Sequence, residues 1–240
     1  IILVQRLGPA TGTATCGAQG DLSVVYGTLS GGFELPTLCI SSIDDCWDLS
    51  AKAVETAIKL RTPVVLLTSK EMVMTLLSYD WSKLSEIKPT KVKAFDGKAP
   101  YLPYAYNDSL VPEFLAVTQK EHQVRITAST HDTKGILQNT SPEAIENTKR
   151  LQKKHEKHIS EYTFFELDEQ KDADTLIISY DITAQASREA VKQLRLQGKK
   201  VSFLAAKTLL PIPKEYIEIS NRYSRVVIAE ENLTGQLRQL

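Results

Sequence analysis

The chain has 240 residues, of which 42% are hydrophobic and 24% charged, and its 29 basic side chains balance 29 acidic ones. That composition is typical of a globular protein, and a net charge of zero gives no general attraction to nucleic acid or to an anionic membrane. No apolar run approaches the roughly 20 residues of a spanning helix. No secretory signal precedes the first expected strand, so we expect a cytoplasmic protein without membrane segments.

The cysteines also limit the kinds of site that the chain can carry. Cys16, Cys39 and Cys46 are an odd number and show no C-x-x-C spacing. This argues against a disulfide framework, an iron–sulfur cluster or a zinc site within the chain, and we predict no metal site in it.

The first stretch predicts a buried strand followed by a loop of small residues. Ile1–Val4 are branched and apolar, Arg6 follows them, and Asp21 can cap a helix that begins with Leu22. Ligands of open α/β sheets bind outside the carboxyl ends of the strands. Because arginine has a fork of donors that matches a carboxylate, the loop suits an acidic small molecule. On residue types alone, a plain turn with a solvated arginine remains the alternative.

Residues 1–78 alternate short apolar runs with helical patterns. This order predicts a parallel sheet with helices on its faces. The expected strands and helices are, in chain order, 1–4, 21–28, 38–40, a helix from Ser42 to about 60, 64–67 and 71–78.

The pattern changes at Tyr79, where a lysine- and proline-rich stretch with little periodicity begins. Such a long irregular segment is usually functional or wraps a partner, and Tyr101–Tyr104 is expected to anchor it on the domain. Ser141-Pro142 then starts a basic helix that reaches about residue 160. We favour a solvated helix packed on one edge over a nucleic-acid surface, because no aromatic side chains interleave with its charges.

A second alternating unit follows from about Asp174. Its expected strands are 175–178, 201–205 and 225–229, and its expected helices begin near Thr183 and Pro213, with Tyr216 and Ile217 facing inward. The predicted fold class is therefore α/β, with two parallel-sheet three-layer units joined by an irregular linker and a basic helix.

Three motifs resemble the alpha subunit of 2-oxoacid:ferredoxin oxidoreductases. They are Val4-Gln5-Arg6-Leu7-Gly8-Pro9-Ala10-Thr11-Gly12 followed by Gln19-Gly20-Asp21-Leu22, then Ser129-Thr130-His131-Asp132-Thr133-Lys134-Gly135, and last Glu230-Glu231-Asn232-Leu233-Thr234-Gly235-Gln236-Leu237. The less specific segments Thr62–Leu67 and Gln197–Pro213 also follow the family's order, so the resemblance covers almost the whole chain.

The resemblance implies a domain division. Residues 1–78 would be the carboxyl-terminal part of a pyrimidine-type thiamine diphosphate-binding domain, and 79–172 a linker with the helix 142–160. Residues 173–240 would be an incomplete transketolase carboxyl-terminal-like domain. We expect a fragment that lacks the amino-terminal segment, with its glutamate for the aminopyrimidine, and the extreme carboxyl end.

The implied reaction is the oxidative decarboxylation of a 2-oxoacid with CoA to acyl-CoA, carbon dioxide and reduced ferredoxin. 2-Oxoglutarate is the favoured substrate, and branched-chain 2-oxoacids come next. Thiamine diphosphate and Mg²⁺ would be shared with a beta subunit, which would hold the [4Fe-4S] cluster, and gamma or delta subunits can join the complex. The chain would be inactive alone, and no nucleic-acid or membrane partner is expected.

The resemblance also implies site residues. Arg6 matches the arginine that faces the 2-oxoacid, where it would hold the substrate oxygens in reacting geometry. His131 and Asp132 match an active-site loop near the subunit interface, and a turn held by side-chain-to-backbone hydrogen bonds is the alternative. The pocket wall would consist of Gly8, Pro9, Thr11 and Gly12.

Two departures from the family pattern support other functions. Cys16-Gly17-Ala18 stands where the family usually has Lys-Thr-Glu, and Ser179–Ile182 replaces a glycine-rich turn. A scaffold subunit that has lost catalysis is therefore the alternative, although Arg6 in its motif argues against it. A transketolase-like transferase would share the fold but use no iron–sulfur partner.

Overall fold

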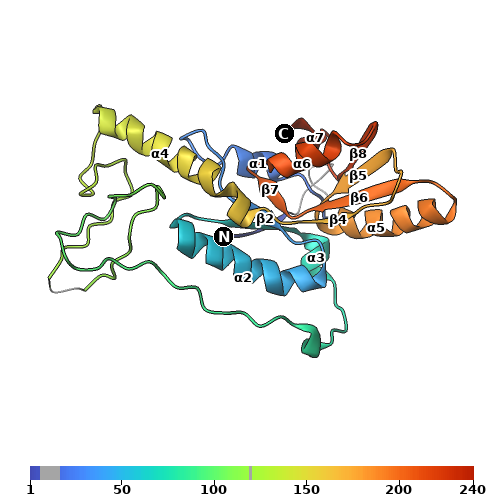
Figure 1. Cartoon of the computed structure of the whole chain (residues 1–240), viewed down its shortest axis with the longest axis horizontal. Coiled ribbons are helices and arrows are strands. Elements are labelled where there is room, and N and C mark those ends of the chain that lie inside the picture. The colour runs from blue at the N-terminus through green and yellow to red at the C-terminus, as the bar shows by residue number, and fades with distance from the viewer. Residues whose placement is uncertain (6–16, 119–120) are drawn as a thin grey trace.

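Two four-stranded sheets meet across a shared core in the computed structural model, which describes residues 1–5, 17–118 and 121–240 (Figure 1). The first sheet has the order β1 (Ile2–Gln5), β3 (Val65–Ser69), β2 (Thr37–Cys39), β7 (Thr208–Leu210). The second has the order β4 (Phe165–Asp168), β6 (Val201–Ala206), β5 (Thr175–Ser179), β8 (Arg225–Ala229). The predicted α/β class is confirmed.

The described helices follow the expected order. They are α1 (Leu22–Tyr26), α2 (Ile43–Leu60), α3 (Lys70–Met74), α4 (Pro142–His158), α5 (Asp181–Leu196), α6 (Lys214–Ser220) and α7 (Gln236–Gln239), with short 3₁₀ turns at Trp81–Lys83 and Ile159–Tyr162. In the described part of the chain, no helix is both long enough and apolar enough to cross a bilayer.

The first sheet is parallel at its centre, with a strand from the other half of the chain at its edge. β1 and β2 both run parallel to β3, so these strands end on the same side of the sheet. β7 pairs antiparallel with β2, which the sequence did not predict. The second unit therefore completes the first sheet and is not a separate layer behind a linker.

Burial on both faces explains why β3 is uniformly apolar. Leu66 on one face packs with Leu38 and Leu49 beneath α2. Leu67 on the opposite face packs into a core that also contains Leu176 and Leu204 of the second sheet. Successive strand residues point to opposite faces, so β3 lies between α2 and the second unit.

The start of α2 shows how local sequence joins the two units. The Ser42 hydroxyl accepts a hydrogen bond from the Asp45 backbone N–H at 3.3 Å, as expected for a cap. The Asp45 carboxylate reaches back past the N-cap to Ser41. It accepts bonds from the Ser41 N–H and hydroxyl, both at 2.8 Å, and from Lys207 Nζ at 2.6 Å. Lys207 directly precedes β7, so this ion pair holds the edge strand beside β2.

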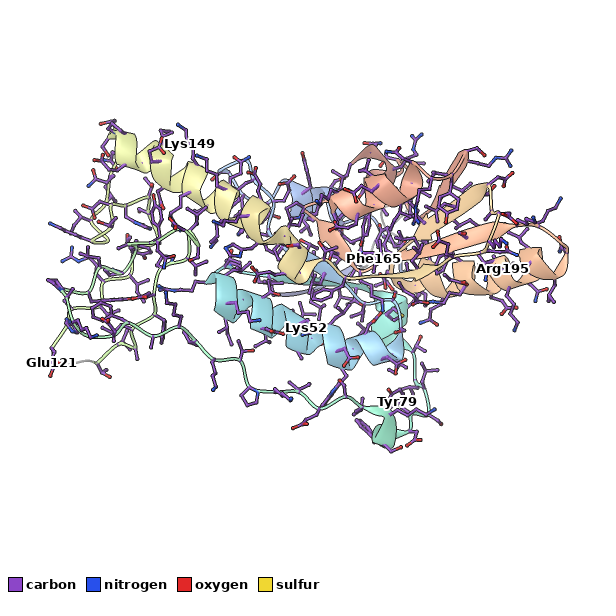
Figure 2. The ribbon with its side chains drawn as sticks, viewed as in Figure 1. Lys52, Tyr79, Glu121, Lys149, Phe165 and Arg195 are labelled. Carbon is purple, nitrogen blue, oxygen red and sulfur yellow. The ribbon has the colours of Figure 1, made fainter. Side chains whose placement is uncertain are left out.

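The irregular segment after α3 runs along α2 toward the end of the first sheet at which its parallel strands begin (Figure 1). At its start lies Tyr79, which is labelled in Figure 2. Its hydroxyl donates to Asp44 on the first turn of α2. At its far end, Tyr101 and Pro103 are buried, and Arg61 Nη1 donates to the Pro103 carbonyl at 3.5 Å, so the segment expected to anchor the linker contacts the first unit at this residue. Arg61, just after α2, donates to the backbone carbonyls of Pro112 and Glu113 at 3.2 and 2.6 Å.

α4 is packed along one edge, as expected, but the side chains on its packed face are mostly basic, which the sequence did not predict. Arg150, Lys154 and His155 are buried. Lys154 Nζ donates to the Leu60 carbonyl at 2.8 Å, and Arg150 Nη1 donates to the Leu110 carbonyl at 3.0 Å. These cations bind carbonyl groups that α2 and the linker leave free, which a charge pattern alone cannot reveal.

The inward face of α6 also differs from the prediction. Tyr216 is buried as expected, but Ile217 is 57% exposed and Ile219 is buried in its place. The Tyr216 hydroxyl donates to the Phe164 carbonyl at 3.1 Å, which orients the helix. Residues three positions apart share a helix face, so Ile219 turns inward with Tyr216.

Candidate active site

Polar side chains gather where the parallel strands of the first sheet end. Gln5 ends β1, Ser69 ends β3, and Asp181 begins α5 of the second unit; all three are fully buried. Gln5 Nε2 donates to Asp181 Oδ2 at 3.4 Å, and the Ser69 hydroxyl donates to Asp181 Oδ1 at 3.1 Å. We call these three residues the strand-end cluster. It lies on the side of the sheet where α/β proteins bind ligands.

Asp181 has an unusual backbone and an unusual acidity. Its φ of 52° is in the left-handed region, which glycine adopts freely and Asp tolerates better than most residues. Burial raises the pKa of its carboxyl to about 7, hydrogen bonds from Ser69 oppose this increase, and the nearby charge of Glu71 adds to it. Asp181 thus keeps the backbone shape of a glycine turn and adds a buried carboxyl group.

Glu71 of α3 lies against the chain that returns from the loop. Its Oε1 accepts a hydrogen bond from the Gly17 backbone N–H at 2.5 Å. A Cβ atom on Gly17 would lie 1.6 Å from Glu71 Oε2, so a larger residue would displace this carboxylate. Because these atoms are the end of a flexible side chain, a larger residue at this position of the Cys16-Gly17-Ala18 departure needs only a shift of Glu71.

Gln19 joins the returning chain to the second unit. It is fully buried. Its Nε2 donates to the Tyr180 carbonyl at 2.8 Å, and its Oε1 accepts from the Thr183 hydroxyl at 2.9 Å and the Glu231 N–H at 2.7 Å. Its backbone carbonyl accepts from the Tyr180 hydroxyl and from Asn232 Nδ2, both at 3.2 Å. Each polar atom of its side chain thus has a partner in the second unit.

The third sequence motif folds into a turn that contacts the first motif. Asn232 Oδ1 accepts from the Gly235 N–H at 2.7 Å, and Glu230 Oε2 accepts from the Leu237 N–H at 2.8 Å. Gln236 Nε2 then donates to the Gly20 carbonyl at 2.8 Å. We call this contact the clasp; it consists of Gln19, Gly20, Tyr180, Thr183, Glu231, Asn232 and Gln236.

The predicted substrate loop lies between these contacts in the sequence. Arg6, Gly8, Pro9, Thr11 and Gly12 fall within residues 6–16, outside the part that the structure describes. The described residues on either side of this range are tied to Asp181 at one end and to Glu71 and the clasp at the other. The roles of the five loop residues stay predictions.

His131 and Asp132 lie in the linker, which packs at the opposite end of the first sheet. Asp132 Oδ1 accepts from the backbone N–H groups of Lys134 and Ile136 at 2.9 and 3.0 Å, and the latter bond lowers the pKa of the carboxyl. The His131 ring stacks on Tyr104 with centroids 3.5 Å apart. The structure thus shows the expected turn and does not bring these residues to the strand-end cluster. Their role near a subunit interface stays a prediction.

Further polar atoms near the strand ends fit a polar ligand. Thr68 Oγ1, Glu71 Oε2 and Ser179 Oγ are buried without a hydrogen-bond partner among the described residues. They lie at or just beyond the ends of β3 and β5, and buried polar atoms normally have partners. The hydrogen-bonding capacity of these three oxygens is thus unused among the described residues. Among the described residues, no group of three or more His, Cys, Asp and Glu side chains is placed to hold a metal ion.

Sequence reasoning missed Gln5, Gln19 and Asp181 as site residues. Gln5 and Gln19 are in the first motif, but spacing alone does not show that their amides reach the second unit. Asp181 was visible only as a departure from a glycine-rich turn. Its positive φ is the physical signal that explains the position.

Comparison with known proteins adds two family matches. Residues 1–157 match the family described as pyruvate flavodoxin/ferredoxin oxidoreductase, thiamine diphosphate-binding. Residues 173–239 match the pyruvate:ferredoxin oxidoreductase core domain II.

Similar proteins have names from the same group. The chain is 28% identical, over 99% of its length, to the 2-oxoglutarate synthase subunit KorA of Methanothermobacter marburgensis, and it spans 63% of that protein. It is 27% identical, over all of its length, to the 2-oxoglutarate oxidoreductase subunit KorA of Mycobacterium tuberculosis, and it spans 37% of that protein.

A solved structure shows the same arrangement. The 2-oxoglutarate:ferredoxin oxidoreductase from Magnetococcus marinus, with 2-oxoglutarate, coenzyme A and succinyl-CoA bound, matches with a TM-score of 0.86 and 25% identity. The match covers 99% of this chain and 42% of that one. Since the thiamine diphosphate-binding family profile spans 157 of the 240 residues, the chain belongs to the pyruvate flavodoxin/ferredoxin oxidoreductase family.

Proposed function

We propose that the chain is part of the alpha subunit of a thiamine-dependent 2-oxoacid:ferredoxin oxidoreductase. The enzyme oxidatively decarboxylates a 2-oxoacid with CoA to acyl-CoA, carbon dioxide and reduced ferredoxin. The observation that carries the proposal is the strand-end cluster, which flanks the motif of Arg6 at the ligand-binding side of a thiamine-family sheet. 2-Oxoglutarate is the favoured substrate, because several relatives and the matching solved structure are named for it.

The residues of this chain have distinct roles in the proposal. Arg6 binds the carboxylate or carbonyl oxygens of the substrate through its guanidinium. The wall of the pocket is formed by Gly8, Pro9, Thr11 and Gly12. Bound thiamine diphosphate would supply a carbanion for attack on the 2-oxo group. The oxygens of Thr68, Glu71 and Ser179 would offer it polar contacts on the pyrimidine side.

The complex needs other subunits in this proposal. A beta subunit contributes the diphosphate and Mg²⁺ side of the thiamine site and the [4Fe-4S] cluster, and ferredoxin accepts the electrons. Gamma or delta subunits can join, and the assembly is cytoplasmic. The loop of His131 and Asp132 would contact a neighbouring subunit, because it lies on the linker, away from the strand-end cluster.

The direct test is an assay of the full-length protein coexpressed with its beta subunit. CoA-dependent reduction of a viologen dye is measured with 2-oxoglutarate, pyruvate and 2-oxoisovalerate. Reduction with 2-oxoglutarate supports the proposal, and reduction with another acid corrects the substrate. No reduction by a complex that contains cluster and thiamine diphosphate supports the scaffold alternative.

The role of Arg6 has its own matched control. Arg6→Ala should lower turnover by about 100-fold with assembly intact, because a charged donor to the substrate is lost. Arg222→Ala removes an arginine of the second unit that pairs with Glu169 on the surface, and it should leave turnover unchanged. Equal activity of both variants would remove Arg6 from the proposed site.

A further inference from the structure

The stretch of chain that begins at the end of α3 leaves large apolar side chains in contact with water. Leu76 is 95% exposed, and Val73, Met74, Leu77 and Trp81 are each more than half exposed. We call these five residues the apolar arm. Single exposed apolar residues are common on protein surfaces, whereas several that follow one another closely along the chain mark an interaction surface.

The apolar arm also lacks charge over most of its length. Residues 72–79 contain no Asp, Glu, Lys, Arg or His, although 24% of the whole chain is charged. A charged partner surface would lose water at this segment and gain no opposite charge in return, which is unfavourable. The surface that covers the apolar arm must therefore be apolar itself.

The backbone within the apolar arm is available for a partner as well. Thr75 and Asp80 have extended backbone, with ψ angles of 126° and 102°. Between them, the N–H and C=O groups of Leu76, Leu77 and Ser78 form no hydrogen bond with any described residue. Buried backbone groups need hydrogen-bond partners. A partner that covers this segment must therefore supply them, as a strand added along an extended segment does.

The place of the apolar arm in the fold indicates which partner lies against it. Ser69, the last residue of β3, belongs to the strand-end cluster, and Glu71 of α3 bonds the Gly17 N–H. From α3 the chain runs away from the sheets to the turn at Trp81–Lys83 (Figure 1). The apolar arm thus begins beside the candidate active site, which a beta subunit completes in the proposed function.

We propose that the apolar arm is a docking site for the beta subunit, which covers Leu76 and Leu77 with an apolar surface and forms hydrogen bonds with the backbone of residues 76–78. The inference rests on the proposed function for the identity of the partner. It does not rest on turnover, because the association of the subunits is measured directly.

Leu76→Asp tests the apolar contact. Because Leu76 is almost fully exposed, the melting temperature of the full-length alpha subunit alone should not change. The dissociation constant of the separately purified alpha and beta subunits, measured by sedimentation, should rise at least about 100-fold, as expected when a buried interface anchor is lost. Leu196→Asp is the matched control, because Leu196 is 75% exposed at the far end of α5. It should leave the dissociation constant unchanged.

Hydrogen exchange tests the backbone contact in the wild-type proteins. The amides of residues 76–78 should exchange at least about 10-fold more slowly in the complex than in the alpha subunit alone. The turn at residues 171–172 precedes β5 and lies at the opposite end of the second sheet. Its amides should exchange at the same rate in both samples.

Three results would overturn the inference. They are an unchanged dissociation constant for Leu76→Asp, unchanged exchange at residues 76–78, and self-association of the alpha subunit that Leu76→Asp abolishes without affecting the beta subunit. The last result would make a second copy of the chain the occupant. If the subunits associate as expected but turn over no 2-oxoacid, the proposed function fails and the docking site stands. If the complex is active and Leu76→Asp binds the beta subunit normally, the docking inference alone fails.

Discussion

Two groups of hydrogen bonds hold the irregular segments of the molecule, and they differ in the charge of their donors. One is the clasp, and the other, which we call the linker anchor, consists of Arg61, Arg150 and Lys154 with the carbonyl groups that they bind. In the clasp, the Gln19 amide has partners for both its donor and its acceptor in the second unit. In the linker anchor, three cations lie close together and bind neutral carbonyls.

The two arrangements differ in whether buried charge is left without an opposite charge. The amide network of the clasp is neutral and complete. Burial and the neighbouring charges of Arg150 and Arg61 lower the pKa of Lys154 to about 7. We conclude that the clasp leaves no polar atom of the Gln19 side chain without a partner, whereas the linker anchor responds to pH.

The largest expected effect comes from breaking the clasp. Gln19→Leu removes one of the two donors to the Tyr180 carbonyl and the acceptor of both the Thr183 hydroxyl and the Glu231 N–H. The free energy of unfolding should therefore fall by about 4 kcal/mol, or roughly 1–1.5 kcal/mol for each lost hydrogen bond. Urea denaturation measures this change. Gln170→Leu is the control, since it removes an amide from a half-buried position. A loss of the same size in both variants would contradict the special role of the clasp.

The second prediction concerns Asp181 and acid pH. Its folded pKa of about 7 lies above the ordinary value, so between about pH 4 and 7 the unfolded chain releases this proton while the folded chain keeps it. Stability should therefore fall with rising pH over this window, by about 3 kcal/mol. Asp181→Asn should remove this slope in urea denaturation at pH 5 and 7.5. A slope that persists in the variant would assign it to other groups.

The third prediction concerns Lys154 and alkaline pH. Its folded pKa of about 7 lies below that of a free lysine, so above pH 7 the unfolded chain binds a proton that the folded chain has lost. Stability should rise from pH 7 to pH 9, by about 2 kcal/mol relative to Lys154→Met. Lys149→Met changes an exposed lysine of the same helix (Figure 2), and it should show no such difference.

The smallest expected effect sharpens the comparison at the linker. Arg61→Met removes the donor to Pro112 and Glu113, and it should lower the free energy of unfolding by about 1–2 kcal/mol. Chymotrypsin should then cut faster within residues 101–114. Lys59→Met alters only a surface pair with Glu55 and should change neither quantity. Faster cleavage in both variants would mean that the linker is not held by Arg61.

Local patterns predicted the elements well, and contacts between distant segments were out of their reach. The apolar run at 64–67 and the cap at Ser42 identify β3 and α2, because both depend on neighbouring residues. Thr208–Leu210 shows no alternation, and its place beside β2 depends on a strand about 170 residues away. The same limit applies to the candidate site, where motif spacing marked Gln19 and Asn232 but could not show that they meet.

The burial of charged side chains was the other feature that the sequence could not predict. The charges of α4 suggest a solvated face, and only the positions of the Leu60 and Leu110 carbonyls show why Lys154 and Arg150 turn inward. Ile217 and Ile219 are equally apolar, and the hydroxyl bond of Tyr216 decides which of them is buried.

The antiparallel edge strand β7 has a consequence for how the chain is made. A ribosome releases residues 1–69 long before Thr208 emerges, so β2 keeps an open hydrogen-bonding edge during most of synthesis. Contacts between such distant residues also slow folding, because a long loop must close first. Nascent chains that stop before β7 should therefore need protection from aggregation, and the first unit acquires its final shape only when the second is almost complete.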